Sequence, residues 1–290
     1  MTNYIATPSR TQAIMKEHHF SVKKSLGQNF LIDVNTLTRI IESAGIDSDS
    51  NVIEIGPGIG SLTEQLALKA KKVVAFEIDQ RLQPVLAETL SPYDNIKIIF
   101  EDILNADIEN IIRTEFSPDE KVHIVANLPY YITTPILLKL LHSQLPIDTM
   151  TVMMQKEVAE RMAAEPNSKA YGSLTIAVQY YTKAEIIMDV PKTVFLPQPN
   201  VTSSVLHLNL NAKKEVDVQN EKLFFDVIRA SFVHRRKTIL NNLGVYYKGE
   251  YTKDELKNLL NQAEIDPQRR GESLSIDDFA KLSNRFENNK

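Results

Sequence analysis

The sequence predicts an α/β fold with a doubly wound sheet, followed by a small all-helical part. Seven short runs rich in β-branched residues alternate with amphipathic helical stretches, at residues 51–56, 72–78, 96–102, 122–127, 150–155, 184–190 and 203–210. The first four runs are almost continuously apolar, as strands covered on both faces are. This alternation predicts a mostly parallel, Rossmann-like sheet with helices on both faces. A Pro-rich connection separates the last two runs, which we expect to form an antiparallel edge pair.

Three segments are expected along the 290 residues. Residues 1–22 are polar with weak periodicity and should form a flexible N-terminal segment. Residues 23–212 contain all seven predicted strands, and residues 213–290 show helical patterns only. One large domain with a small helical domain also suits a chain of this length, whose 43% apolar residues can fill a sizeable core.

Composition excludes several kinds of site. The chain has no cysteine, which rules out disulfides, thiolate metal ligands and cysteine nucleophiles, and no metal site is expected. The N-terminus lacks an apolar signal segment and no stretch reaches the run of about 18 apolar residues that a membrane helix needs, so we expect a cytoplasmic protein. The net charge of −4 divides into +3 over residues 1–30, −9 over 31–212 and +2 over 213–290. An acidic centre between more basic ends is compatible with phosphate binding by the ends.

A glycine-rich turn follows the first predicted strand. In "EIGPGIGSLTEQ", Gly56, Gly58 and Gly60 allow the backbone to turn tightly and to approach a ligand closely. A dinucleotide fingerprint would place its third glycine at position 61, where the chain has Ser61. The spacing therefore favours S-adenosylmethionine over a nicotinamide dinucleotide. The alternative is a tight strand-to-helix turn that binds nothing.

Polar residues close the next three strands. Glu77, Asp102 and Asn127 come at or just after the ends of the second, third and fourth runs. Because ligands of such sheets bind beyond the carboxyl ends of the strands, we expect these side chains to share one crevice with Gly56. One carboxylate could accept the ribose hydroxyls and the other an adenine amino group, and an acidic pocket suits a sulfonium cation. The alternative is that both acids are solvated strand ends.

The segment "NLPYYIT" suggests chemistry on an amine of a planar base. Such an amine is a poor nucleophile, and acceptors aimed at both N–H bonds would pyramidalise it. The side-chain carbonyl of Asn127 and the main-chain carbonyl of Leu128 are the candidate acceptors, Pro129 stiffens the turn, and Tyr130 can stack on the base. Phe195, in "VFLPQPNVTSS", is the candidate second wall at the pocket rim. The structural alternatives are a turn residue for Asn127 and a core aromatic for Phe195.

Together these motifs resemble the ribosomal RNA adenine N6-dimethyltransferase family, in its bacterial small-subunit (16S) branch. The resemblance runs from about residue 23 to residue 282 through "KKSLGQNFL", "EIGPGIGSLT", "FEID", "EDIL", "NLPY", "FLPQPNVTS" and "FVHRRKTILNNL". It implies a seven-stranded class I S-adenosylmethionine methyltransferase domain. It also implies dimethylation of two adjacent adenines in the 3′-terminal hairpin loop of small-subunit rRNA, within a 30S subunit or its precursor, and a role in subunit biogenesis. No heptad or repeat indicates more than a monomer.

The resemblance also implies site residues. Those for the cofactor are Gln28, Asn29, Leu31, Gly56, Gly58, Glu77, Ile78, Asp102, Ile103 and Asn127. Those for the target base and catalysis are Asn127, Leu128, Pro129, Tyr130 and Phe195. Those for RNA phosphates are Lys23, Lys24, Arg235, Arg236, Lys237, Arg269 and Arg270. We expect the run from His234 to Lys237 to spread around a helix, and a merely solvated helix face is the alternative.

Four other functions are weighed against this one. A large-subunit rRNA methyltransferase of the macrolide-resistance type would share the chemistry. A DNA adenine methyltransferase would usually carry D/N-P-P-Y where this chain has "NLPY". A ribosome-assembly or RNA-binding factor, in which catalysis is secondary, could keep the same fold. A nicotinamide oxidoreductase is disfavoured by the glycine spacing.

Overall fold

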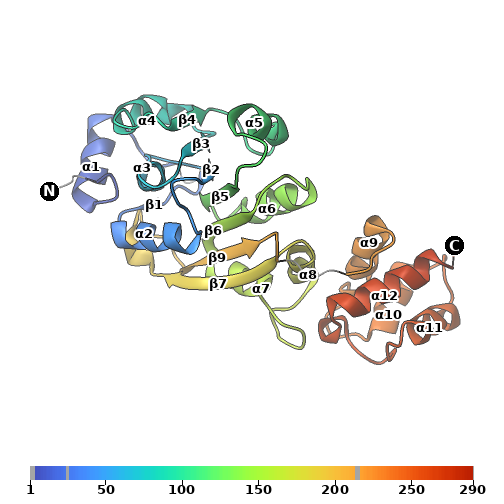
Figure 1. Ribbon diagram of the computed structural model, residues 1–290. Helices are drawn as coiled ribbons and strands as arrows, with labels where there is room; N and C mark the ends of the chain where they lie inside the picture. Colours follow the sequence, from blue (N-terminus) through green and yellow to red (C-terminus); the bar gives the residue numbers. More distant parts are fainter. Residues whose placement is uncertain (1–3, 24–25, 213–215, 290) are drawn as a thin grey trace. The chain divides into compact units, whose positions relative to one another are not determined.

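The computed structural model describes residues 4–23, 26–212 and 216–289, and the chain divides into two compact units (Figure 1). Unit 1 comprises Met1–Ala159 and Ala184–Asn211, and unit 2 comprises Glu160–Lys183 and Ala212–Lys290. The junction between the units at Asn211 and Ala212 coincides with the domain boundary that the sequence predicts near residue 212. The inclusion of residues 160–183 in unit 2 was not expected, because periodicity along the chain does not show which segments pack together.

The elements of unit 1 alternate between strand and helix. The strands are β1 Phe30–Leu31, β2 Asn51–Ile55, β3 Lys72–Phe76, β4 Ile96–Ile99, β5 Val122–Asn127, β6 Thr149–Gln155, β7 Lys183–Val190, β8 Phe195–Leu196 and β9 Ser203–Asn209. The helices are α1 Pro8–Glu17, α2 Val34–Ser43, α3 Ser61–Ala67, α4 Gln83–Thr89, α5 Ile108–Glu115 and α6 Thr133–His142, with short 3₁₀ turns at Gln80–Leu82 and Lys192–Val194. Helix α7 Lys156–Met162 begins in unit 1 and ends in residues assigned to unit 2.

Seven strands form one sheet in the order β4-β3-β2-β5-β6-β9-β7. Strands β2 to β6 are parallel, and β9 runs antiparallel to β6, with Asn209 opposite Thr149. The predicted fold class and all seven predicted strands are confirmed, with strand ends that differ by at most three residues. The last two predicted strands are neighbours at one end of the sheet, where β7 is the edge strand and β9 lies between β6 and β7; β4 is the edge strand at the other end.

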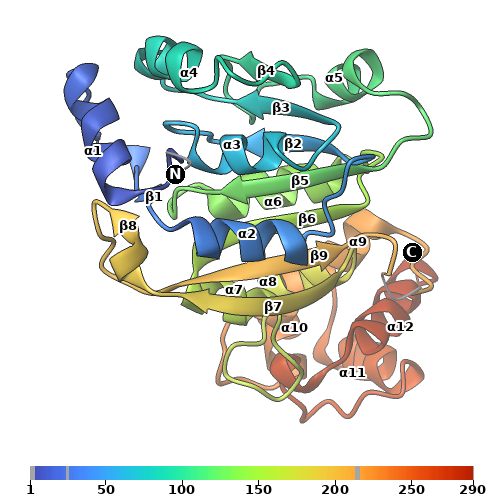
Figure 2. The same cartoon turned by 60° about the vertical axis from the view of Figure 1, so that its left-hand side comes forward.

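Helices cover both faces of this sheet, which is why its central strands are buried and largely apolar. All five residues of β2 are buried. Val52 of β2 and Val73 of β3 pack in one cluster with apolar residues of α2 and α3, and Figure 2 shows these two helices in front of the strands and α6 behind them. The Asp33 side chain caps α2 by accepting the Thr36 N–H at 2.9 Å.

A second, two-stranded sheet was not predicted. β1 and β8 pair antiparallel, with Phe30 opposite Leu196 and Leu31 opposite Phe195. Two-residue strands are too short to show a period in the sequence. The pairing brings the "GQNFL" segment beside the "FLPQP" segment, which lies more than 160 residues later.

The N-terminal segment, expected to be flexible, contains helix α1. Pro8 occupies the first turn and the Thr7 side chain accepts the Arg10 N–H at 3.3 Å. Ile5 and Ile14 are buried in a cluster with apolar residues of α4, and the Glu64 carboxylate accepts the Ile5 N–H at 2.9 Å. The weak periodicity of this segment hid a helix that is fixed mainly by tertiary contacts.

Unit 2 is helical, with its own apolar core. Its helices are α8 Ser173–Gln179, α9 Glu221–Ser231, α10 Ile239–Tyr246, α11 Lys253–Gln262 and α12 Ile276–Glu287, with a 3₁₀ turn at Gly271–Ser273. Capping boxes begin α11 at Thr252 and α12 at Ser275. The core contains most of the apolar positions that follow helical spacing in residues 224–243.

One helix prediction was wrong. The basic run from His234 to Lys237 lies in a loop between α9 and α10. The buried Asn242 side chain stabilises this loop: it accepts the His234 N–H at 2.9 Å and donates to the Ser231 carbonyl at 2.8 Å. Thr238 then caps α10. Helical spacing on both sides of the loop made the two helices look continuous.

No helix among the described residues is long and apolar enough to cross a lipid bilayer.

Candidate active site

A pocket in unit 1 lies at the carboxyl ends of strands β2 to β5. Every residue predicted to bind the cofactor or the target base lines it: Gln28, Asn29, Leu31, Gly56, Gly58, Glu77, Ile78, Asp102, Ile103, Asn127, Leu128, Pro129, Tyr130 and Phe195. The parallel register of these strands brings their ends to one edge of the sheet. The structure therefore collects the predicted residues at one place, while their individual roles remain predictions.

The glycine turn forms one wall of the pocket and has a backbone that other residues rarely adopt. Gly56 and Gly58 have φ angles of +74° and +60°. A Cβ atom on Gly58 would lie 2.9 Å from the ring of Phe30, which packs against the turn from β1. Both the conformation and the close approach of Phe30 therefore require glycine at position 58.

Glu77 is a buried carboxylate held by two backbone amides. Its side chain accepts the Gly58 N–H at 3.1 Å and the Asp79 N–H at 2.8 Å, and the residue is 5% exposed. Burial raises the pKa of Glu77, and the two N–H groups oppose that shift. Asp102, from the next strand, accepts the Leu104 N–H at 2.9 Å. Two carboxylates with oxygen lone pairs to spare thus meet at the pocket.

Two polar residues of this region were not predicted. Ser61 begins α3 and lines the pocket, and its buried hydroxyl has no hydrogen-bond partner within the described residues. Glu54, in β2 behind the glycine turn, is 1% exposed, and neither of its carboxylate oxygens has a partner there. Burial and the nearby Glu77 raise the pKa of Glu54 to about 8, so it is largely protonated at neutral pH. An acid in the middle of an apolar strand was the available signal for Glu54.

The Asn127 amide has a defined orientation. Its nitrogen donates to the Asn29 carbonyl at 3.2 Å, which leaves the side-chain oxygen as an acceptor. The Pro129 carbonyl is occupied, because it accepts from Ile132 N–H and from the Thr133 hydroxyl. Among the described residues, neither the Asn127 side-chain oxygen nor the Leu128 carbonyl accepts a hydrogen bond from another group. Two neighbouring acceptors therefore remain for a ligand.

The aromatic side chains of Tyr130, Tyr131 and Phe195 line the same pocket, and they differ in how exposed and how firmly held they are. The Tyr130 hydroxyl lies 2.8 Å from the buried Ser203 hydroxyl, which fixes one end of the ring, and burial raises the pKa of Tyr130. Phe195 lines the pocket but is 2% exposed and packs in a core cluster, so it is part of the pocket wall and not an exposed ring at the rim. The exposed ring of this pocket belongs to Tyr131, which is 59% exposed and was not predicted.

The predicted phosphate-binding residues are distributed over both units. Lys23 belongs to unit 1 and is exposed, and Lys24 lies outside the described residues. In unit 2, Arg236 and Lys237 are exposed in the loop between α9 and α10, and Arg235 there pairs with Glu272 at 3.5 Å. Arg270 is exposed at 3.9 Å from Glu272.

The Arg269 side chain makes its polar contacts with other residues of unit 2. Its guanidinium is half-buried, donates to the Ser273 carbonyl and hydroxyl, and lies 3.5 Å from Asp278. Among the predicted basic residues of unit 2, Arg236 and Lys237 are the better suited to bind phosphate, because Arg235 and Arg269 already contact acidic or carbonyl oxygens.

A scan of the described residues finds no group of three or more histidine or acidic side chains that could hold a metal ion.

Comparison with known proteins places the chain in a family. The family model described as "Ribosomal RNA adenine dimethylase" matches residues 19–286. The chain belongs to the ribosomal RNA adenine dimethylase family. A protein of Oceanobacillus iheyensis named "Ribosomal RNA small subunit methyltransferase A" is 56% identical over 283 residues, which cover 98% of this chain and 96% of the relative. A protein of the same name from Anoxybacillus flavithermus is 59% identical over 283 residues, covering 97% and 96%. The predicted membership of the bacterial small-subunit branch is confirmed.

Two solved structures share this fold at lower identity. A dimethyladenosine transferase of Plasmodium falciparum has a TM-score of 0.71 at 28% identity, covering 89% of this chain and 98% of that one. The 23S rRNA methyltransferase ErmE has a TM-score of 0.66 at 26% identity, covering 89% and 99%. The class I methyltransferase fold is confirmed.

S-adenosylmethionine is the methyl donor of such enzymes, and the pocket fits it. Gly56 leaves room for a ligand, because the nearest atom to a Cβ at that position would be the Asn127 main-chain carbonyl oxygen at 4.0 Å, and the unpartnered hydroxyl of Ser61 lies in the same lining. Glu77 and Asp102 both line the pocket, and their carboxylate oxygens are the predicted acceptors for hydroxyl and amino groups. The exposed apolar side chain of Ile78, which follows Glu77 in the chain, also lines the pocket and can contact a flat base.

Proposed function

We propose that this chain transfers methyl groups from S-adenosylmethionine to the N6 amines of adenines in small-subunit rRNA. The observation that carries the proposal is the fixed amide of Asn127, whose oxygen and the neighbouring Leu128 carbonyl are both left as acceptors at the cofactor pocket. The names of the small-subunit relatives support the choice of RNA.

The chain's own residues would prepare the amine for methylation. S-adenosylmethionine supplies a methyl group bound to a sulfonium. The acceptors of Asn127 and Leu128 would each take one N–H bond of the adenine amine, which draws the lone pair out of conjugation with the ring and towards the cofactor pocket. Tyr130, fixed by Ser203, would stack on the extruded base, an interaction worth about 1–3 kcal/mol. No general base is needed to start this reaction, because the neutral amine attacks through its own lone pair; the excess proton on the methylated nitrogen would then pass to water.

More specifically, we infer that two methyl groups are added to each of two adjacent adenines in the 3′-terminal hairpin loop. We infer that the substrate is this rRNA within a 30S subunit or its precursor, that the chain acts as a cytoplasmic monomer, and that it serves small-subunit biogenesis. The exposed Arg236, Lys237 and Lys23 would contact phosphates, which position the RNA without reading its sequence. Family membership and the exposure of these cations support this assignment.

The large-subunit alternative has weaker support. The solved 23S rRNA methyltransferase is 26% identical to this chain, whereas the small-subunit relatives are 56% and 59% identical. An assembly factor without essential catalysis would not need the oriented Asn127 amide. The nicotinamide alternative has no support among the relatives described here.

Methylation of defined substrates tests the proposal. Purified protein is incubated with labelled S-adenosylmethionine and under-methylated small subunits, under-methylated large subunits or free rRNA, and the modified bases are mapped. We expect dimethyladenosine in the small-subunit rRNA only. Label in large-subunit rRNA alone would establish the alternative, and binding to small subunits without label would establish the assembly-factor function.

A further inference from the structure

A chain of hydrogen bonds links the cofactor pocket to the segment that precedes β1. Glu77 accepts the Asp79 N–H at 2.8 Å, and the Asp79 carboxylate accepts the Gln28 amide at 2.9 Å. The Gln28 oxygen in turn accepts the Lys23 N–H at 2.9 Å. Both ends of the Gln28 amide are thus engaged with protein groups. Gln28 lines the pocket, so these bonds decide how its side chain is presented there.

Arg81 extends this series of hydrogen bonds through its guanidinium group. Its guanidinium makes a two-pronged contact with Asp79, from Nε to Oδ1 at 2.9 Å and from Nη2 to Oδ2 at 2.6 Å. Its third nitrogen, Nη1, donates to the Ser21 carbonyl at 3.3 Å. The guanidinium carbon also lies 4.9 Å from the centre of the Phe20 ring. One side chain therefore contacts both the acid at the pocket and the segment that leads to Gln28.

Asp79 needs this partner. The residue is 5% exposed, and burial by itself would raise the pKa of its carboxyl, but hydrogen bonds from Arg81 and Gln28 lower it overall. Asp79 is therefore a buried anion whose charge is matched by one partly exposed arginine. A bidentate arginine contact with a carboxylate also fixes geometry, which a lysine cannot reproduce.

We propose that Arg81 and Asp79 are positioning residues for the cofactor: they hold Phe20, Ser21 and Gln28 in place beside the pocket before S-adenosylmethionine binds. In residues 20–23 and 26–28, the described part of this segment, the only regular structure is a 3₁₀ turn at Leu26 and Gly27, so side-chain contacts largely determine the position of the segment. Ordering a backbone segment costs conformational entropy, and a prearranged segment avoids that cost at binding. The inference rests on the proposed function, because it takes the pocket to bind S-adenosylmethionine.

Equilibrium binding of S-adenosylmethionine by calorimetry, without RNA, tests the proposal on the full chain. We expect Arg81→Met to raise the Kd about 10-fold, the effect of losing about one charged hydrogen bond. Arg81→Lys should recover only part of the loss, because lysine lacks the two-pronged geometry. The matched control is Arg113→Met, an exposed arginine of α5 that bonds to Asn110 and lies outside the pocket lining, and it should bind as the parent does.

Turnover separates positioning from a general loss of structure. With rRNA substrate, Arg81→Met should raise the KM for S-adenosylmethionine about 10-fold while kcat at saturating cofactor and the KM for RNA stay within about 2-fold of the parent. A fall in kcat with unchanged cofactor affinity would overturn the proposal.

A double variant keeps the test decisive if Arg81→Met folds poorly. Asp79→Asn/Arg81→Met leaves no unpaired buried charge, so it should unfold at a temperature close to the parent's and still bind the cofactor weakly. Parental affinity in this variant would overturn the proposal. Failure of the parent itself to bind S-adenosylmethionine would instead overturn the proposed function.

Discussion

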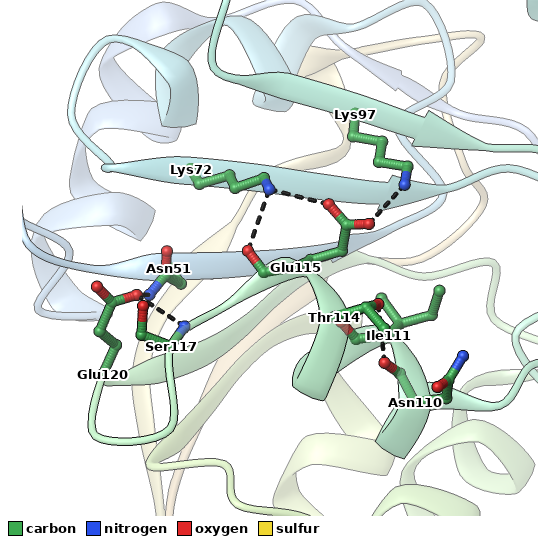
Figure 3. A network of polar contacts seen from close by, with 9 residues as sticks. All are labelled: Asn51, Lys72, Lys97, Asn110, Ile111, Thr114, Glu115, Ser117 and Glu120. Atoms are coloured by element: carbon green, nitrogen blue, oxygen red, sulfur yellow. Dashed lines mark hydrogen bonds and ion pairs between the residues drawn. The ribbon is translucent and has the colours of Figure 1, made fainter.

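Acidic side chains lie near both ends of the parallel strands, but their hydrogen-bond partners differ between the two ends. At the amino ends, Glu115 accepts from Lys72 at 2.9 Å and from Lys97 at 2.5 Å, and Glu120 accepts from Asn51 at 2.8 Å (Figure 3). Glu120 also pairs with Lys71. At the carboxyl ends, Glu77 is met only by backbone N–H groups, and Glu54 by no partner within the described residues.

The pKa shifts of these acids have opposite signs for this reason. Lysine contacts lower the pKa of Glu115, whereas burial raises the pKa of Glu54 and of Glu77. The amino ends form a closed network in which charges satisfy one another. The carboxyl ends keep acceptors without protein partners, which costs stability and leaves them for a ligand. The comparison teaches that acidic side chains alone do not mark the site: lysines neutralise Glu115 and Glu120 at the amino ends, whereas Glu54 and Glu77 at the carboxyl ends have no cationic partner among the described residues.

The largest expected effect at the carboxyl ends is the loss of the Asn127 acceptor. Asn127→Ala should lower kcat for methylation at least about 100-fold, because one of two preorganised acceptors is gone, while RNA affinity stays within a few-fold. Single-turnover methylation and filter binding measure the two quantities. Lys97→Met, at the amino ends, is the matched control and should methylate normally. Near-normal turnover of Asn127→Ala would remove this residue from the mechanism.

The next effect is on cofactor affinity. Glu77→Gln keeps the shape of the side chain and removes its charge, so S-adenosylmethionine should bind about 10-fold more weakly. Calorimetry measures this, and Glu120→Gln should leave the Kd unchanged. An equal loss in both variants would mean that the acidic field of the unit, and not the position of Glu77, holds the cofactor.

The pH dependence of stability should differ between the two ends. Glu54 has a raised pKa, so the folded state keeps a proton that the unfolded chain releases above the ordinary value of about 4.3. Its contribution to stability should therefore fall from there up to about pH 8 and then stay level. Glu54→Gln should remove this slope and gain about 1 kcal/mol or more relative to the parent between pH 5 and pH 7. Urea unfolding across this range measures it, and a parallel pair of curves would contradict the buried, protonated state of Glu54.

The smallest effect is expected for Glu115 at the amino ends, where the free energy of unfolding should decrease as the pH falls. Glu115 has a lowered pKa, so its contribution is fully present above the ordinary value of about 4.3 and is lost as pH falls through the lowered one. Glu115→Gln should cost about 1 kcal/mol or less at pH 7, because Lys72 and Lys97 are partly exposed and screened by water. Methylation should be unchanged. A loss of activity would show that the two ends of the sheet are coupled.

Local residue patterns identified most of the fold and the set of pocket residues. The seven strands follow from β-branched runs, and the convergence of Gly56, Glu77, Asp102 and Asn127 follows from the rule that parallel strands end together. The loop from His234 to Lys237 was misjudged, because helical spacing continues on both sides while Asn242 breaks the helix through contacts eight and eleven residues away.

The sequence by itself determined the sheet, the family and the pocket residues that carry recognisable motifs, because strand period, turn chemistry and motif spacing are local properties. Only the tertiary structure decided the state of those residues. Asn29 orients the Asn127 amide from 98 positions away, Arg81 contacts Ser21 across 60 positions, and burial protonates Glu54. Hydrogen-bond direction and desolvation depend on groups that folding brings together, so no local pattern can encode them.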